Sequence, residues 1–300
     1  MSKKYLLSWV KAIRPFTFTG SVIPVTLGAF FAMRETSLQA GYFILSLLAI
    51  IALQAGTNLL NDYDDYTSNV DTVDSQLSSG VIIHKLLKPK EVLLGGQISL
   101  ALGILTGLYL SMQKGIFIFI IGVIGTLGAY FYTGKPLALK YRGLGAPLVF
   151  LLFGPFMVIG SYYVQAQRIS LSSILISVPV GLLTTAILHA NDIRDIYHDQ
   201  KAGIKTLSIL VGESNSRKIY DLLLLVSYAS VILMVICRII PYLCLVCLVT
   251  APDALKCMSK LRANSSQSDG LATFDKDTAQ LEAKFGSILI LSILVSNIIW

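Results

Sequence analysis

The hydrophobic pattern of the chain consists of long apolar runs rather than the short amphipathic segments of a soluble protein. Nine runs predict helices at 16–33, 38–60, 92–112, 115–132, 144–164, 171–190, 219–237, 239–255 and 286–300. A helix needs about twenty apolar residues to cross a bilayer. The last run has only fifteen, about 22 Å at helical rise, and we expect Trp300 at the far interface. The pattern predicts an all-α, polytopic membrane protein formed by one domain, residues 1–300.

Composition and charge support this interpretation. Hydrophobic residues make up 54% of the chain and charged residues 14%, whereas soluble domains are about 25% charged. With nine spans, the N-terminus and alternate loops share one side, which holds 20 of the 24 Lys and Arg residues. The opposite loops hold one basic residue each: Arg34, Lys114, Arg168 and Arg238. Because basic loops stay in the cytoplasm, we expect a multi-pass cell-membrane protein with a cytoplasmic N-terminus. The net charge of +7 then reflects topology, and no nucleic-acid partner is expected.

Two acidic segments follow apolar runs and share an Asn-Asp-x-x-Asp pattern. The first, "NDYDDYTSNVD", begins at Asn61, and the second, "NDIRDIYHD", begins at Asn191. The aspartates that we single out in them are Asp65, Asp71, Asp195 and Asp199. Four runs separate the two segments, so both open toward the same side of the membrane. If each helix continues past its apolar run, residues four apart line one face.

Clustered carboxylates at a membrane surface repel one another and need compensation. Magnesium prefers a few carboxylates, several waters and substrate phosphate oxygens, so two facing clusters could bind Mg²⁺ and a diphosphate between them. Asn61 and Asn191 would add neutral oxygens or donate amide hydrogens to the phosphate. A solvated acidic loop is the alternative for either segment alone. A calcium loop is disfavoured because the chain lacks a D-x-D-x-D-G spacing.

Several other residues are candidates for an anionic or aromatic substrate. Arg194 and Lys205 lie within or just after the second acidic segment. The remaining candidates on the same side or at the ends of the spans are Arg14, Asn58, Tyr132, Lys140 and His189. The basic members have an alternative role in topology, and Tyr132 could equally belong to an interfacial aromatic belt. Gly122, Gly125 and Gly128 predict close helix packing in the fourth run.

The chain resembles the UbiA-type membrane-embedded aromatic prenyltransferases, and within them the menaquinone-pathway branch. Four ordered segments carry the resemblance: "RPFTFTGSVIPVTLGA", "NLLNDYDDYTSNVDTVDS", "YTGKPLALKYRGLG" and "NDIRDIYHDQKAGIKTLSILVG". It implies nine transmembrane helices around a central cavity, with a cytoplasmic cap. It also implies that the two acidic motifs bind Mg²⁺ and the diphosphate of a polyprenyl donor, through Asn61, Asp65 and Asp71 and through Asn191, Asp195 and Asp199.

The resulting hypothesis is Mg²⁺-dependent prenyl transfer from a polyprenyl diphosphate to an aromatic ring. The menaquinone branch implies 1,4-dihydroxy-2-naphthoate as acceptor, with loss of its carboxylate. We expect Asp65 and Asp195 to act in catalysis, with Arg194 and Lys205 stabilising the departing diphosphate. The alternatives are other UbiA-type acceptors, such as 4-hydroxybenzoate, homogentisate or a glycerol phosphate, and an ion-coupled secondary transporter. A transporter usually places its acids near the membrane midplane, whereas here they cluster at one end of the spans.

Overall fold

The computed structural model describes residues 3–67, 79–134, 136–201, 203–266 and 269–299, and these residues form helices, turns and loops without any strand. The uninterrupted long helices are α2 (Thr19–Ala32), α3 (Ala40–Thr67), α4 (Pro89–Lys114), α5 (Ile116–Thr133), α8 (Leu171–Arg194), α11 (Glu213–Ile236) and α13 (Phe274–Ile299). Two further rods are composite. One is α6 (Gly145–Leu151), the π-helical turn η3 (Leu152–Phe156) and α7 (Met157–Ala166); the other is the 3-10 segment η4 (Tyr242–Thr250) and α12 (Ala251–Ala263).

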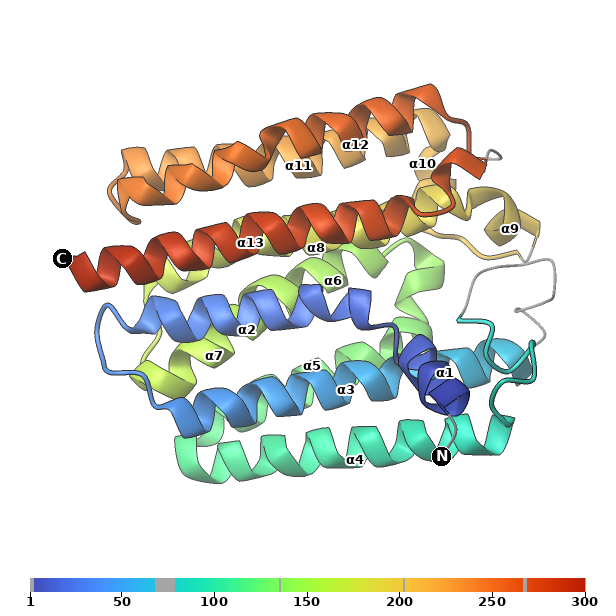
Figure 1. Cartoon of the computed structure of the whole chain (residues 1–300), viewed down its shortest axis with the longest axis horizontal. Coiled ribbons are helices and arrows are strands. Elements are labelled where there is room, and N and C mark those ends of the chain that lie inside the picture. The colour runs from blue at the N-terminus through green and yellow to red at the C-terminus, as the bar shows by residue number, and fades with distance from the viewer. Residues whose placement is uncertain (1–2, 68–78, 135, 202, 267–268, 300) are drawn as a thin grey trace.

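Short helices join the rods at their ends. They are α1 (Lys3–Ile13), η1 (Pro15–Phe18), η2 (Leu139–Arg142), α9 (Ile196–Lys201), α10 (Leu207–Val211) and η5 (Asp269–Leu271). The rods run side by side, and α1 crosses their direction next to α3 (Figure 1). The C-terminal ends of α3 and α8 lie at the same end of the bundle, together with α9 and α10 (Figure 1).

Each of the nine predicted runs lies in a helical rod. Within the described residues, eight of the rods are long and apolar enough to cross a membrane when η1 is counted together with α2 (Pro15–Ala32), and the apolar part of α5, Ile116–Tyr132, is shorter. The prediction for the last span was wrong in its length. Its helix begins at Phe274 rather than at residue 286 and has 26 residues, about 39 Å at helical rise. The first turns of α13 were missed because their polar residues look like a loop in the sequence.

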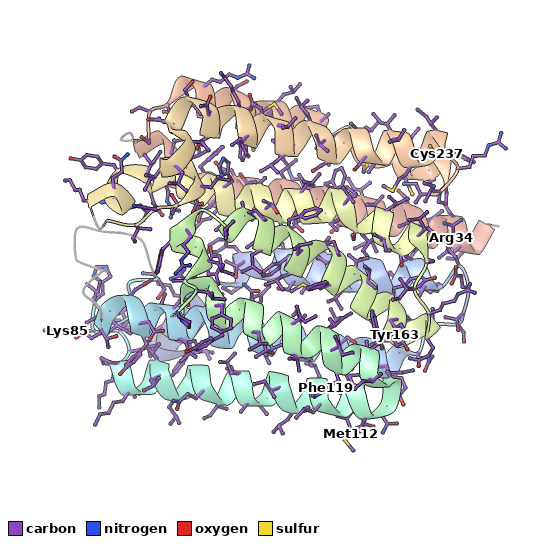
Figure 2. All side chains as sticks on the ribbon, turned by 180° about the vertical axis from the view of Figure 1, so that it is seen from behind. Arg34, Lys85, Met112, Phe119, Tyr163 and Cys237 are labelled. Carbon is purple, nitrogen blue, oxygen red and sulfur yellow. The ribbon has the colours of Figure 1, made fainter. Side chains whose placement is uncertain are left out.

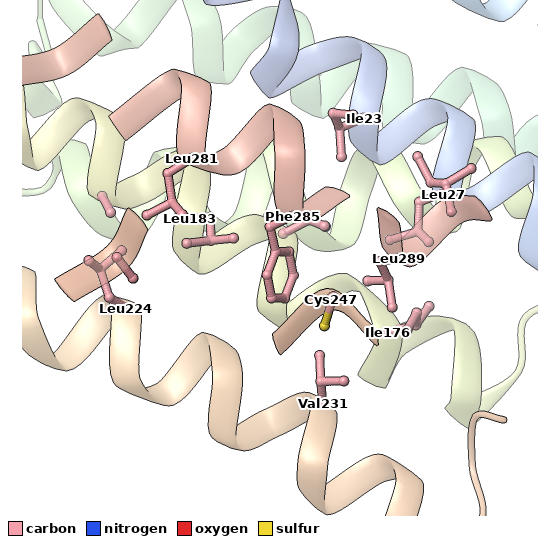
Figure 3. Packing of buried hydrophobic residues seen from close by; sticks show 14 of the residues in the cluster. Ile23, Leu27, Ile176, Leu183, Leu224, Val231, Cys247, Leu281, Phe285 and Leu289 are labelled. Atoms are coloured by element: carbon pink, nitrogen blue, oxygen red, sulfur yellow. The ribbon is translucent and has the colours of Figure 1, made fainter. Parts of the chain in front are cut away.

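The main core lies between the helices of the C-terminal half and α2. Figure 3 shows Phe285 and Leu289 of α13 facing Cys247 of η4 and Ile176 of α8. By contrast, apolar side chains such as Met112 project away from the bundle (Figure 2), where Met112 is exposed. A bilayer solvates such apolar surface, so this outward distribution supports a multi-pass membrane protein.

Glycine permits one close helix crossing. A Cβ at Gly154, in η3, would come within 2.9 Å of the Gly181 Cα on α8. The packing expected at the glycines of the fourth run is confirmed only at Gly128, where a Cβ would lie 3.0 Å from Leu152. It was wrong for Gly122 and Gly125, because nothing lies within 4 Å of a Cβ at either position.

The predicted separation of charge is visible along the bundle. Arg34 and Lys85, which belong to loops assigned to opposite sides, lie at opposite ends (Figure 2). Arg34 donates a hydrogen bond of 2.8 Å to the Ile239 carbonyl, which joins two loops at its own end. Both acidic motifs lie at the other end, so one side of the bundle carries the candidate chemistry.

Candidate active site

The first acidic motif lies on a helix that continues beyond its apolar run. Because α3 extends to Thr67, Asn61 and Asp65 are one helical turn apart on the same face, as predicted, and both are half-buried. Asp62, between them, is buried and forms an ion pair with Arg14. The backbone amide and the hydroxyl of Ser79 also donate hydrogen bonds to Asp62. Asp71, predicted as a metal ligand, lies outside the described residues.

Arg14 and Asn58 hold the first motif in position. Arg14 has a left-handed backbone (φ 51°) at the corner between α1 and η1, which aims its side chain at Asp62. The amide of Asn58 donates hydrogen bonds of 2.9 Å to the Ile13 carbonyl and to the Thr17 hydroxyl. The prediction that Asn58 binds substrate is therefore not supported by these contacts, since its donors are used to fix the chain just before α2.

The second motif lies at the junction between α8 and α9. The guanidinium of Arg194 donates two hydrogen bonds of 2.7 Å to Asp195 and forms an ion pair of 2.9 Å with Asp275 at the start of α13. Asp192 and Asp199 are buried, and Oδ1 of Asp192 has no hydrogen-bond partner in the structure as described. Arg194 thus holds Asp195 through both carboxylate oxygens.

The central loop brings a lysine to the second motif. Burial opposes the charge of Lys140, yet the Tyr132 phenol and the carboxylates of Asp192 and Asp199 outweigh it and hold the Lys140 pKa above its usual value. Burial raises the pKa of Asp199 to about 6, against the lowering effect of Lys140 and with a further increase from Asp195. Lys140 is therefore charged at neutral pH and lies among the acids of the second motif.

Tyr141 connects the two motifs. Burial raises its pKa; Lys140 lowers it, and the carboxylates Asp65 and Asp199 raise it further. Tyr141 is therefore within electrostatic range of one aspartate from each motif, at the end of the bundle where both motifs lie (Figure 1). Tyr132 is close by, since a Cβ at Gly145 would lie 3.4 Å from the Tyr132 ring and 3.5 Å from the Lys140 Cα.

Two predicted residues lie apart from this cluster. His189 is fully buried, and its Nε2 makes a hydrogen bond of 2.9 Å with the Ser216 carbonyl of α11. Nε2 is used in the contact between α8 and α11, but Nδ1 has no hydrogen-bond partner in the described structure, so contact with an acceptor stays a prediction. Lys205 is exposed in the segment that precedes α10.

Comparison with known proteins identifies the family of this chain. The model of the UbiA prenyltransferase family matches residues 21–282. The chain belongs to the UbiA prenyltransferase family. The relatives include two proteins named 1,4-dihydroxy-2-naphthoate octaprenyltransferase. The one from Bacillus subtilis is 32% identical, over 94% of this chain and 91% of its own length, and the one from Mycobacterium tuberculosis is 34% identical, over 85% and 86%.

A solved structure supports the fold. A UbiA homolog from Archaeoglobus fulgidus bound to GPP and Mg²⁺ superimposes with a TM-score of 0.62, covering 94% of this chain and 99% of its own, at 16% identity. Membership of the UbiA prenyltransferase family confirms that this is a prenyltransferase and disfavours the transporter alternative. The predicted all-α membrane fold is confirmed as well.

The residues of this UbiA prenyltransferase fit a magnesium ion in their chemistry. Among the described residues, no three His, Cys, Asp or Glu side chains lie close enough together to surround one metal ion. Magnesium bound with a diphosphate usually needs only one or two carboxylates, because phosphate and water oxygens complete its shell. The unpartnered Oδ1 of Asp192 and the buried carboxyl of Asp199 are oxygen donors of the required kind.

The sequence did not identify some acids of this UbiA prenyltransferase as important. Asp275 completes the partner set of Arg194, and Glu282 on α13 is fully buried, with neither oxygen hydrogen-bonded within the structure as described. Both lie in the part of α13 that was predicted to be a loop, and an acidic residue in a loop gives no indication of a functional site. A correct start of α13 would have placed Glu282 inside a span, the expected signal of a functional or strained position.

Proposed function

We propose that this chain transfers a polyprenyl group from a polyprenyl diphosphate to 1,4-dihydroxy-2-naphthoate, with loss of the acceptor's carboxylate as CO₂. The proposal is carried by the position of the two Asn-Asp-x-x-Asp helix ends at the same end of the bundle, with Tyr141 in electrostatic range of an aspartate from each (Figure 1). The acceptor is supported by the names of the two bacterial relatives, which align along most of the chain. The site combines residues from α3, η2 and α8–α9, which supports a single domain over residues 1–300.

Asp65, Asp195 and Asp199 are the described residues that would hold Mg²⁺, and Asp71 completes the proposed set. When bound, Mg²⁺ neutralises the diphosphate and makes it a better leaving group. Asn61 and Asn191, both half-buried, would donate amide hydrogens to the phosphate oxygens. Arg194 would position Asp195 rather than reach the diphosphate, since three of its N–H groups already bond to carboxylates.

Cleavage of the allylic C–O bond leaves its electron pair on the diphosphate, and the electron-rich ring attacks the allylic carbon. Lys140 stays protonated and offsets the charge that develops on the leaving group. Exposed Lys205 would provide a second cation for the released diphosphate. Tyr132, beside Lys140, would place its ring near the allylic cation. Arg14 would act indirectly, by holding Asp62.

The same proposal assigns the active site to the cytoplasmic side. Of the 24 Lys and Arg residues, 20 belong to the N-terminal segment and the loops on the side of the two motifs. The apolar outer surface of the rods would lie in lipid and exclude water from the isoprenoid chain.

The test is prenyl transfer by purified protein in detergent. We expect Mg²⁺, a polyprenyl diphosphate and 1,4-dihydroxy-2-naphthoate to give a prenylated, decarboxylated product by mass spectrometry, and chelation of Mg²⁺ to abolish it. Asp65→Asn and Asp195→Asn should each lower the rate about 100-fold or more. The matched control is Asp64→Asn, at an exposed aspartate next to Asp65.

Two results would contradict the proposal. Product formation from 4-hydroxybenzoate or homogentisate but not from the naphthoate would assign another acceptor. Equal rates of prenyl transfer by Asp65→Asn and Asp64→Asn would show that the first motif is not part of the active site.

A further inference from the structure

Helix α1 presents three different faces. Its inner face packs on the bundle through buried Ser8 and Ala12. Next to them, the Trp9 ring lies where a Cβ on Gly95 of α4 would approach to 2.7 Å. Tyr5, on the same side, donates a hydrogen bond of 3.4 Å to Glu91 of α4. This face fixes the helix against α3 and α4.

The second face of α1 is apolar and exposed. Leu6 and Val10, four residues apart, share one side of the helix with Leu7. Their exposed fractions are 57% for Leu6, 56% for Leu7 and 44% for Val10. Apolar surface is also exposed on α4 close to α1, because Leu94, the neighbour of Gly95 in the chain, is exposed.

The third face is basic. Lys4 and Lys11, seven residues apart, lie on one side of the helix, whereas Lys3 lies in the first turn on the side of Leu7 and Val10; all three lysines are exposed. The helix contains no acidic residue. A helix with separate apolar and basic faces lies in the plane of a membrane interface, with lysines at the headgroups.

The position of α1 fits such an interface. The spanning rods define the membrane normal, and α1 runs across them at the end that carries both acidic motifs (Figure 1). Directly after α1, Arg14 forms its ion pair with Asp62, and the Ile13 carbonyl accepts the hydrogen bond from Asn58. Movement of α1 would therefore be transmitted to the first motif.

We infer that α1 is an interfacial anchor that binds anionic phospholipids of the adjoining leaflet. Leu6, Leu7 and Val10 enter the acyl region, and Lys3, Lys4 and Lys11 contact the lipid phosphates. The bound lipid holds the corner at Arg14 and so stabilises the end of α3. An anionic leaflet is the partner with complementary charge, because the exposed side of α1 has lysines and no acidic residue.

The first experiment measures depth. Single cysteines replace Leu6, Val10, Lys4 or Lys11 in a chain whose exposed Cys237 is changed to Ser. Each carries a fluorophore, and the full chain is reconstituted in vesicles with acyl-brominated phosphatidylcholine and phosphatidylglycerol. We expect bromine to quench labels at Leu6 and Val10 several-fold more than labels at Lys4 and Lys11. Equal quenching overturns the inference, and so do labels at Leu6 and Val10 that are shielded from water but not quenched, since a protein partner would then cover the face.

The second experiment measures lipid binding through stability. In detergent, phosphatidylglycerol should raise the midpoint of thermal unfolding of the wild-type chain relative to phosphatidylcholine. The gain should be lost when Lys3, Lys4 and Lys11 are changed to Gln. A matched variant loses the same charge at three exposed lysines on or just before α4: Lys85, Lys88 and Lys90. It should keep the gain.

Two results would overturn the inference in that assay. Retention of the gain without the α1 lysines would show that lipid binds elsewhere. Loss of the gain in both triple variants would show that only overall charge matters. Neither readout requires prenyl transfer, so failure of the proposed function is distinguishable from failure of this inference.

Discussion

Replacement of Arg194 by glutamine should destabilise the protein strongly. The guanidinium makes two hydrogen bonds of 2.7 Å to Asp195 and an ion pair of 2.9 Å with Asp275. Its side chain is only 15% exposed, and those of Asp195 and Asp275 are 10% and 9% exposed. Glutamine removes the cation and leaves two nearly buried carboxylates without it.

The magnitude follows from this burial. Removing one partner of a buried ion pair costs about 3–5 kcal/mol, mainly because the other charge stays desolvated. For a chain of 300 residues, this corresponds to a fall of about 5–8 °C in the unfolding midpoint. The assay is thermal unfolding of purified protein in detergent, at one fixed scan rate for all variants.

Arg262 provides a matched control. It also contacts an aspartate at 2.7 Å, Asp221, but its side chain is 70% exposed. Exposed ion pairs contribute about 0–1 kcal/mol, so Arg262→Gln should change the midpoint by less than about 2 °C. Equal losses for the two arginine variants, or no loss for Arg194→Gln, would refute the claim that burial makes the Arg194 pair important.

A second readout separates the two partners of Arg194. Asp275→Asn leaves both Arg194–Asp195 hydrogen bonds available, so the Mg²⁺ concentration that gives half-maximal prenyl transfer should stay as in the wild type. Arg194→Gln releases Asp195, and half-maximal activity should then need about 10-fold more Mg²⁺ or more. The same Mg²⁺ requirement in both variants would show that Arg194 does not position Asp195.

Three further predictions use the same thermal assay. Gly28→Ala should lower stability by about 1–3 kcal/mol, because its Cβ would overlap a backbone carbonyl of α7. Gly122→Ala, with nothing within 4 Å of the new Cβ, should be neutral or gain up to about 1 kcal/mol; a similar fall in both would contradict the packing argument. Glu282→Leu should raise the midpoint, since it replaces a buried carboxyl without a hydrogen bond in the described structure by an apolar side chain, and a lower midpoint would show that the carboxyl itself is needed. Burial raises the pKa of Glu35, but hydrogen bonds from the Tyr162 hydroxyl and from Arg168 hold this pKa below the usual value. The stability that these hydrogen bonds contribute is complete above the unfolded pKa of a glutamate, about 4.3, and is lost as pH falls through the lower folded pKa of Glu35. Arg168→Gln should therefore lower the unfolding midpoint at pH 7 but not at a pH below the folded pKa of Glu35. The same difference in midpoint between wild type and variant at both pH values would refute this.

The positions of the spans could be predicted because lipid imposes a minimum apolar length. The start of α13 could not, because its polar residues are satisfied by partners far away in the chain. Asp277 contacts Lys260 at 2.5 Å, and Lys284 contacts Asp253 at 2.7 Å, both across the α12–α13 pair. A single sequence does not reveal such pairs, so the polar turns resembled a loop. Helix α1 was missed for a related reason, since its basic residues were attributed to topology alone.

The motifs could be located from the sequence, but the roles of neighbouring polar residues could not. Asn58 and His189 are polar positions in apolar spans, which is typical of substrate contacts. In the structure their hydrogen bonds go to the backbone of Ile13 and of Ser216. Hydropathy identifies a buried polar group but not its partner, and only the packing of α8 on α11 reveals the carbonyl that His189 meets.

The two acidic repeats are alike in sequence but differ in which aspartate is neutralised. Arg14 pairs with Asp62, the second residue of the first repeat, whereas Arg194 pairs with Asp195, the fifth residue of the second. The partners differ because Arg14 comes from the corner before η1, while Arg194 lies within the second repeat itself. A consequence is that Asp192, the counterpart of Asp62, retains an oxygen without a hydrogen bond in the described structure and lies near Lys140. Equivalent positions in the two repeats therefore need not have equivalent roles, because Arg14 holds Asp62 whereas no arginine pairs with Asp192 in the described structure.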